Sequence, residues 1–121
     1  MMNKETMMTD NHLTDYLTAI RTSYADHHIK MNVDADDGTK AIRAEMYDDF
    51  CANLRFEVGN KYIKVITKNS VHSFIVNTDK DREFKKGDIL KANSWTAPAR
   101  NFARGNIVKK QYGGLSWTGV A

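Results

Sequence analysis

Two arginines four residues apart, Arg100 and Arg104, are the side chains of this sequence best suited to chemistry. A guanidinium group keeps its positive charge at any physiological pH, and its planar set of donors matches two phosphate oxygens at once. If residues 99–103 form a helical turn, both side chains project from the same side. The spacing therefore predicts that the two arginines together bind a pyrophosphate or two phosphodiesters.

Aromatic and amide side chains surround these arginines in the segment NSWTAPARNFARGN, residues 93–106. Trp95 and Phe102 can each offer a ring face to a purine, and such stacking is worth about 1–3 kcal/mol per base. Asn101 supplies both a donor and an acceptor for a base edge. The segment has no hydrophobic period, and loops of this kind often hold function. The alternative is that both arginines pair with acidic helices while the two rings are simply buried.

Two further residues are weaker candidates for ligand contact. Phe74 alternates with Ser73 and Ile75 in an expected strand, where packing in the core is the favoured interpretation. Arg21 stands beside the apolar stripe of an expected first helix and could close over a ligand. Such an arginine is more often simply solvated.

No catalytic or metal-binding constellation is recognisable in the sequence. Cys51 is the only cysteine and lies in an apolar stretch, where a thiol behaves as a small inert hydrophobe. Asp34, Asp36 and Glu45 imitate part of a calcium loop, but Gly38 falls one place too early. The four histidines lack tight metal-ligand spacing, and no glycine-rich phosphate loop is present. We therefore expect a binding protein that is not an enzyme and uses no metal or cofactor.

The elements that must position these residues follow from the periodicity of the apolar side chains. Helical spacing predicts helices over about residues 11–31 and 39–53, with Asp10 or Asn11 capping the first. Alternation and turn residues then predict strands over residues 55–58, 61–67, 71–77, 88–92 and 115–118. The fold class is α+β, with two N-terminal helices packed on a C-terminal four- to five-stranded mostly antiparallel sheet. Residues 1–121 form a single domain, with a helical part over 1–53 and a β part over 54–121.

Charge is divided unevenly along the chain. Residues 1–60 hold six basic and eleven acidic side chains, whereas residues 82–121 hold eight basic and two acidic ones, within a net charge of +3. A basic final third favours an anionic partner such as nucleic acid or a nucleotide phosphate. A solvated basic face without a partner is the alternative.

The sequence also indicates the cellular compartment of the protein. No apolar run is long enough to span a bilayer, and the polar residues 1–10 do not read as a signal peptide. A single cysteine excludes an internal disulfide. We expect a soluble cytoplasmic protein.

Three stretches resemble a known family: KYIKVITKNSVHSFIV (residues 61–76), FKKGDILKANSW (84–95) and APARNFARGNI (97–107). They are similar to the bacteriophage Thoeris anti-defence sponge family, although the N-terminal helices are unmatched in detail. The resemblance implies a phage protein in the cytoplasm of an infected bacterium. It would bind a cyclic ADP-ribose isomer of the glyco-cyclic ADP-ribose type, made by a defence TIR enzyme, and hold it without degrading it.

The resemblance also assigns residues and partners. Arg100 and Arg104 match the paired arginines that hold phosphate, while Phe74 and either Asn93 or Asn101 match groups around the base. Arg21 matches a helix-borne phosphate ligand more weakly. Members of the family are homo-oligomers, dimers or higher, with ligand sites between subunits, and some also hold cyclic oligonucleotides at a separate site.

Two other classes of function compete with this one. A small RNA- or DNA-binding module would follow the nucleic-acid backbone with its basic final third and stack bases on Trp95 or Phe102. Its binding would fall steeply with salt and grow with oligonucleotide length. A protein that binds a host protein through its acidic helices would leave Arg100 and Arg104 structural, so that Arg100→Ala would alter stability more than binding.

Overall fold

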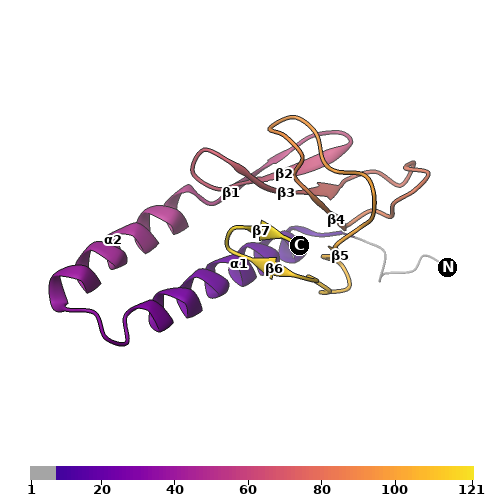
Figure 1. Ribbon diagram of the computed structural model, residues 1–121. Helices are drawn as coiled ribbons and strands as arrows, with labels where there is room; N and C mark the ends of the chain where they lie inside the picture. The colour runs from indigo at the N-terminus through magenta and orange to yellow at the C-terminus, as the bar shows by residue number, and fades with distance from the viewer. Residues whose placement is uncertain (1–7) are drawn as a thin grey trace.

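A computed structural model describes residues 8–121 (Figure 1). Two helices, α1 (Asp10–Met31) and α2 (Asp37–Asn53), form a hairpin at the start of the chain. An antiparallel five-stranded sheet follows in the order β1-β2-β3-β4-β5, and a small two-stranded sheet ends the chain. The five strands are β1 (Arg55–Val58), β2 (Tyr62–Ile66), β3 (Val71–Val76), β4 (Asp88–Lys91) and β5 (Gly105–Asn106); the small sheet pairs β6 (Leu115–Ser116) with β7 (Gly119–Val120). The predicted α+β arrangement is confirmed.

The inner face of the large sheet packs on α1. Ile63, Ile75 and Ile89 face one another across β2, β3 and β4, and all three are buried. They meet the apolar stripe of α1 and Val120 of the C-terminal hairpin in one core. Figure 1 shows α1 and the yellow β6-β7 hairpin on the same side of the sheet. The helical period of α1 and the alternation of the strands therefore supply the two halves of this core.

The outer face of the sheet is covered by loops instead of a helix. Phe74, Val76 and Leu90 point to this side and form a second buried cluster. Phe84, from the loop over residues 77–87, completes the cluster, and Ala103, from the loop over residues 92–104, packs against it. We call these segments the first and second outer loops. Both are parts of the packed fold, and the second contains most of the segment that the sequence singles out.

Residues 99–104 form neither a helix nor a strand, so the helical turn considered for residues 99–103 does not form. The Ala99 N–H donates to the Lys91 carbonyl at 2.8 Å, and the Arg104 N–H donates to the Ile89 carbonyl at 2.7 Å. The two ends of the segment thus bond to β4, which leaves no α-helical turn to align the two arginines. Strand β5, at the end of the predicted loop 93–106, had no side-chain pattern to reveal it. A Cβ at Gly105 would lie 2.1 Å from the Gln111 carbonyl oxygen, so this pairing requires glycine.

Two smaller predictions also differ from the structure. The expected single strand over residues 115–118 is the first half of the β6-β7 hairpin, which turns back at Trp117, whose N–H donates to Ser23 Oγ of α1 at 3.1 Å. The N-cap of α1 is Thr9 and not Asp10 or Asn11, because the Thr9 carbonyl accepts from the His12 N–H and the Thr9 N–H donates to His12 Nδ1.

Most of the polar residues 1–10 lie outside the described part of the chain. Within residues 8–121, neither helix combines the length and apolar character needed to cross a membrane.

Candidate functional site

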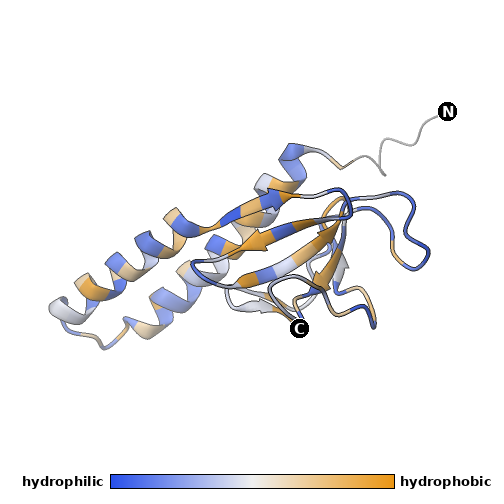
Figure 2. Cartoon of the chain, turned by 90° about the horizontal axis from the view of Figure 1, so that it is seen from above, coloured by the Kyte–Doolittle hydropathy of each residue, from blue (hydrophilic) through white to orange (hydrophobic). Residues whose placement is uncertain are grey.

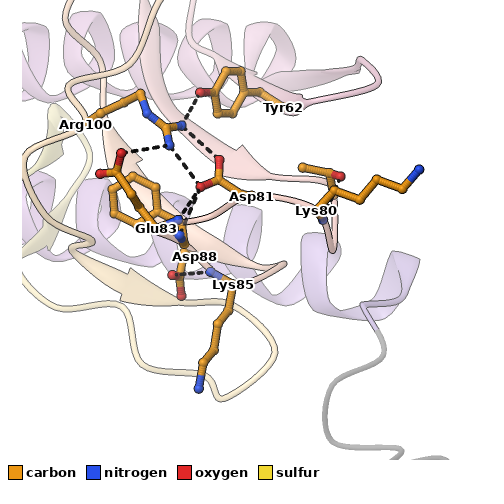
Figure 3. A network of polar contacts seen from close by, with 9 residues as sticks. Tyr62, Lys80, Asp81, Glu83, Lys85, Asp88 and Arg100 are labelled. Carbon is orange, nitrogen blue, oxygen red and sulfur yellow. Dashed lines mark hydrogen bonds and ion pairs between the residues drawn. The ribbon is translucent and has the colours of Figure 1, made fainter.

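Arg100 joins the two outer loops (Figure 3). Its Nη1 and Nη2 atoms donate to Asp81 Oδ2 at 3.0 Å and to Asp81 Oδ1 at 2.9 Å, and Nη1 also donates to Tyr62 Oη at 2.6 Å. The guanidinium carbon lies 4.8 Å from the centre of the Phe84 ring. Glu83 Oε1 lies farther away, at 3.9 Å. We call this arrangement the Arg100 clamp.

The positive charge of Arg100 is largely balanced by Asp81 inside the fold. The Asp81 side chain is only 2% exposed, and its Oδ1 atom also accepts from the backbone N–H groups of Glu83 and Phe84. The hydrogen bond from Arg100, helped by these backbone donors, holds the pKa of Asp81 well below its usual range. The same bond raises the pKa of Arg100. Arg100 therefore stabilises the first outer loop instead of presenting a free fork to a phosphate.

Arg104 is placed differently. Its Nη2 atom donates to Asn101 Oδ1 at 3.0 Å and its Nε atom to the Phe102 carbonyl at 3.3 Å. The guanidinium carbon lies 3.8 Å from the centre of the Phe102 ring, which is 56% exposed. No carboxylate of residues 8–121 lies within ion-pair distance of Arg104. The two arginines thus have separate partners, and only Arg104 has a charge that is not already balanced.

Trp95 lies at the tip of the second outer loop. Its ring is 47% exposed, and Lys64 Nζ of β2 lies 4.8 Å from the centre of the ring. Asn93 is exposed, and its N–H donates to the Ala97 carbonyl to close the loop. This loop therefore presents two exposed aromatic rings, Trp95 and Phe102, each with a cation against it.

Three hollows border the Arg100 clamp. One, of about 360 Å³, is lined in part by Asp81, Phe84 and Lys109. The other two, described next, share a lining residue. The first, of about 440 Å³, lies between the β1-β2 turn and the first outer loop; its charged lining residues are Lys61, Lys80, Asp81, Arg82, Glu83 and Arg100. The second, of about 340 Å³, is lined in part by Glu57, Lys61, Tyr62, Lys64, Phe74 and Thr96. Trp95 is not part of this lining, but its ring lies against Lys64, which is. Lys61 belongs to both hollows, so they adjoin.

Sequence reasoning missed Lys61, Lys80 and Arg82. The surplus of basic residues after residue 60 was a signal, but the three side chains are spread over 22 residues. They meet because the Asn77 N–H donates to the Lys61 carbonyl at 2.9 Å, which brings the start of the first outer loop beside the β1-β2 turn. Figure 3 shows Lys80 extending away from the Arg100 clamp.

Phe74 lines the second hollow but is almost completely buried, and Arg21 is not a lining residue of either hollow. Phe74 is 2% exposed in the outer cluster, with its ring centre 5.8 Å from that of Tyr62, so no ring face is open to a base. Arg21 Nη2 donates to the Cys51 carbonyl at 3.4 Å, which links α1 to the end of α2 beyond the inner face of the sheet. Within residues 8–121, no group of three His, Cys, Asp or Glu side chains is placed to hold a metal ion.

Comparison with known proteins identifies a family whose function is unknown. Neither the curated proteins nor the solved structures include a match to this chain. The profile of a family of unknown function, DUF7717, matches residues 1–120. Since the match covers nearly the whole sequence, the chain belongs to the DUF7717 family.

Proposed function

We propose that this protein binds a phosphate-bearing cyclic nucleotide of the cyclic ADP-ribose type and holds it without degrading it. The observation that carries the proposal is the pair of adjoining hollows that share Lys61, one lined with basic side chains and the other lined by Lys64, whose ammonium group lies against the Trp95 ring. A nucleotide has the same two parts, an anionic phosphate and a flat base. The two hollows can hold both parts of one ligand.

The first hollow suits the phosphates. Arg100 and Asp81 largely compensate each other, so three cations, those of Lys61, Lys80 and Arg82, are set against the single carboxylate of Glu83. Clefts lined by one sign of charge raise the local concentration of the opposite ion. Charge-assisted hydrogen bonds from such side chains contribute about 1.5–3 kcal/mol each.

The second hollow, together with the Trp95 ring beside its lining residue Lys64, suits the base. Stacking on an aromatic ring contributes about 1–3 kcal/mol per base and works for any base, because every base has a flat face. Lys64 beside the ring places positive charge close to the stacked base and its phosphate. In this arrangement Arg100 is a positioning residue, because it fixes the loop that supplies Lys80 and Arg82.

The Phe102–Arg104 pair offers a second place of the same kind on the second outer loop. Its ring is more than half exposed and its guanidinium has only neutral oxygen partners. The resemblance to the Thoeris anti-defence sponges supports a cyclic nucleotide ligand, storage without cleavage, an oligomer, and action in the infected bacterial cell. A second site for cyclic oligonucleotides, as in some members of that family, would fall at Phe102 and Arg104.

Calorimetric titration tests the proposal. The purified protein is titrated with cyclic ADP-ribose isomers, including the glyco-cyclic form, with cyclic oligonucleotides and with a short single-stranded RNA. The ligand is then released by heat and analysed by chromatography. We expect tight binding of a cyclic ADP-ribose isomer and recovery of the intact molecule.

Matched variants locate the site. Lys61→Ala, Arg82→Ala and Trp95→Ala should each weaken binding at least about tenfold, which corresponds to 1.4 kcal/mol. Lys40→Ala removes the same charge from an exposed position on α2, outside the three hollows that border the clamp, and should leave binding unchanged. Cleaved ligand, or binding of RNA alone with a steep salt dependence, would overturn the proposal in favour of an enzyme or a nucleic-acid-binding module.

A further inference from the structure

The hollow of about 440 Å³ is lined mainly by basic side chains but also by the carboxylate of Glu83. We propose that Glu83 makes this hollow selective for a ligand with free sugar hydroxyl groups. Its carboxylate accepts hydrogen bonds from the ribose of the ligand and repels any ligand that brings only phosphate to the same place. The inference rests on the proposed function, because it specifies the chemistry of the ligand that is bound there.

Two acidic residues of the first outer loop, Asp81 and Glu83, have opposite environments. Figure 2 shows this loop as a largely hydrophilic segment that extends past the sheet. Asp81 is buried and accepts from Arg100 and from two backbone N–H groups, one of which belongs to Glu83. The Glu83 side chain is 64% exposed, and its Oε1 atom lies 3.9 Å from Arg100 Nη2, which is beyond hydrogen-bond distance. Glu83 therefore has a fixed backbone and a carboxylate that is free to accept hydrogen bonds.

Glu83 shares its hollow with cations that have no acidic partner. Lys61, Lys80 and Arg82 line the hollow, and no carboxylate of residues 8–121 lies within ion-pair distance of any of them. Figure 3 shows the Glu83 carboxylate turned toward the Arg100 guanidinium, so it lies on the side of the clamp. Lys61 comes from the β1-β2 turn on the other side of the hollow. The hollow thus offers positive charge and a hydrogen-bond acceptor from different walls.

A carboxylate in such a place distinguishes a hydroxyl group from a phosphate. An ionised carboxylate can only accept hydrogen bonds, so it pairs with an O–H group and repels a phosphate oxygen. Two neighbouring ribose hydroxyl groups can donate to its two oxygens. Dinucleotide-binding proteins use the same chemistry, with an acidic residue for a free ribose hydroxyl group and an arginine for a phosphate at that position. Selectivity therefore comes both from the bond to the right ligand and from repulsion of the wrong one.

The cyclic ADP-ribose isomers satisfy both walls of the hollow. Each carries a pyrophosphate and at least one ribose with two neighbouring free hydroxyl groups. Inorganic pyrophosphate carries the charged part alone. The cations of the hollow attract both molecules, whereas the Glu83 carboxylate favours only the one with a ribose. Glu83 is therefore the residue that prevents simple polyphosphates from occupying the hollow.

Calorimetric titration of the full chain with two kinds of probe tests this role. The first probe is whichever cyclic ADP-ribose isomer, the glyco-cyclic form included, binds the wild type most tightly. The second is inorganic pyrophosphate, whose affinity is measured by displacement of the bound isomer. We expect Glu83→Gln to lower the ratio of the isomer affinity to the pyrophosphate affinity at least about tenfold, which corresponds to 1.4 kcal/mol. The ratio is the useful quantity, because a change in overall charge acts on both anions.

Asp79→Asn is the matched control. Asp79 is an exposed residue of the same loop, but it lines the hollow of about 360 Å³ and not the one that contains Glu83. The variant removes the same charge from the loop and should leave the affinity ratio unchanged. Both variants should melt like the wild type, because both side chains are exposed and the Glu83 N–H keeps its bond to Asp81.

The outcomes separate this inference from the proposed function. If the wild type binds an isomer and Glu83→Gln leaves the ratio unchanged, the inference is overturned and the proposed function stands. Glu83 is then only a distant partner of Arg100. If pyrophosphate displaces no isomer, the phosphates of the ligand lie outside this hollow, and the inference is again overturned. If the wild type binds no isomer, both the inference and the proposed function are overturned.

Discussion

Arg100 and Asp81, 19 residues apart in the chain, form a two-pronged ion pair at 2.9 and 3.0 Å that ties together the two loops on the outer face of the sheet. The Asp81 carboxylate is almost completely buried, and Tyr62 of the sheet provides a third anchor. Of the two arginines that stand out in the sequence, Arg100 is thus the one with charged partners inside the fold. Its neighbour Arg104 keeps an unbalanced charge at the surface.

Replacement of Arg100 should destabilise the protein. Arg100→Ala removes the counterion of Asp81, which keeps its two backbone donors, so the free energy of unfolding should fall by about 1–3 kcal/mol. Adding Asp81→Asn to this variant should recover part of the loss, because no buried charge then remains. Urea unfolding measures both changes. Lys68→Ala, which breaks an exposed ion pair with Asp49, is the control and should cost less than about 1 kcal/mol.

The Asp81 carboxylate should also make the protein sensitive to acid. Its pKa is lowered in the folded state, chiefly by the hydrogen bond from Arg100. The stability that this group contributes is therefore complete above its unfolded pKa of about 3.9 and is lost as the pH falls through the lower folded value. Urea unfolding between about pH 2.5 and pH 6 should show a steeper loss for the wild type than for Asp81→Asn. Parallel curves would contradict this role.

A buried chain of three polar side chains joins α1, β3 and β6. Tyr16 Oη lies 2.7 Å from Ser73 Oγ, and Ser73 Oγ lies 2.9 Å from His72 Nδ1. His72 Nε2 donates to the Ser116 carbonyl at 2.7 Å, since a carbonyl can only accept. In neutral His72 the Nδ1 atom then accepts from Ser73, and Ser73 accepts from Tyr16. The Tyr16 and Ser73 hydroxyl groups therefore each donate in a fixed direction along this series of hydrogen bonds.

Removal of the central hydroxyl should leave two buried groups without partners. Ser73 and Tyr16 are fully buried, so Ser73→Ala should lower the free energy of unfolding by about 1–3 kcal/mol. In the Ser73→Ala variant, Tyr16→Phe should lower the free energy of unfolding by less than it does in the wild type, because the hydrogen-bond partner of Tyr16 is already absent. Thermal and urea unfolding of the single and double variants form the cycle. Simple additivity would show that the two hydroxyls act independently.

His72 should give the protein a second pH dependence near neutrality. Burial lowers the pKa of His72, and the hydrogen bond to Ser116 only partly opposes the shift. The corresponding stability is complete above the unfolded histidine pKa of about 6.5 and is lost as the pH falls through the lower folded value. Unfolding measured from pH 8 to pH 5 should show this loss, about equally in the wild type and in a variant of the exposed His27, His27→Gln. A flat profile would mean that His72 is not held neutral.

Replacing two glycines by alanine, one at a time, should change the stability of the protein in opposite directions. Gly113 has a φ of +59°, and a Cβ there would lie 1.9 Å from the Arg104 carbonyl oxygen, so Gly113→Ala should destabilise the fold by more than about 1 kcal/mol. Gly38 lies in the first turn of α2, where a Cβ meets only Asp36 Oδ1 at 3.5 Å. Gly38→Ala should therefore stabilise the protein by up to about 1 kcal/mol. Melting temperatures of the two variants check both signs.

The sequence by itself determined the order of the elements, the fold class and the separation of charge. The stripe from Leu13 to Tyr24 and the alternation around Ile63 and Ile75 are local patterns, and a local pattern reports which side of one element is apolar. The hairpin turns were also readable, because particular residues favour them. The backbone conformation at Ala99 was not readable, because its hydrogen bonds go to another strand.

Only the tertiary structure decided which side chains meet. Arg100 finds Asp81 because two loops fold back over the same face of the sheet, and Lys61 comes near Lys80 because β2 pairs with β3. The periodicity of a sequence describes one element at a time and does not state the distance between atoms of two loops. The partner of an arginine is therefore set by packing over long sequence distances, and the same packing left Arg104 open and closed Arg100 into an ion pair.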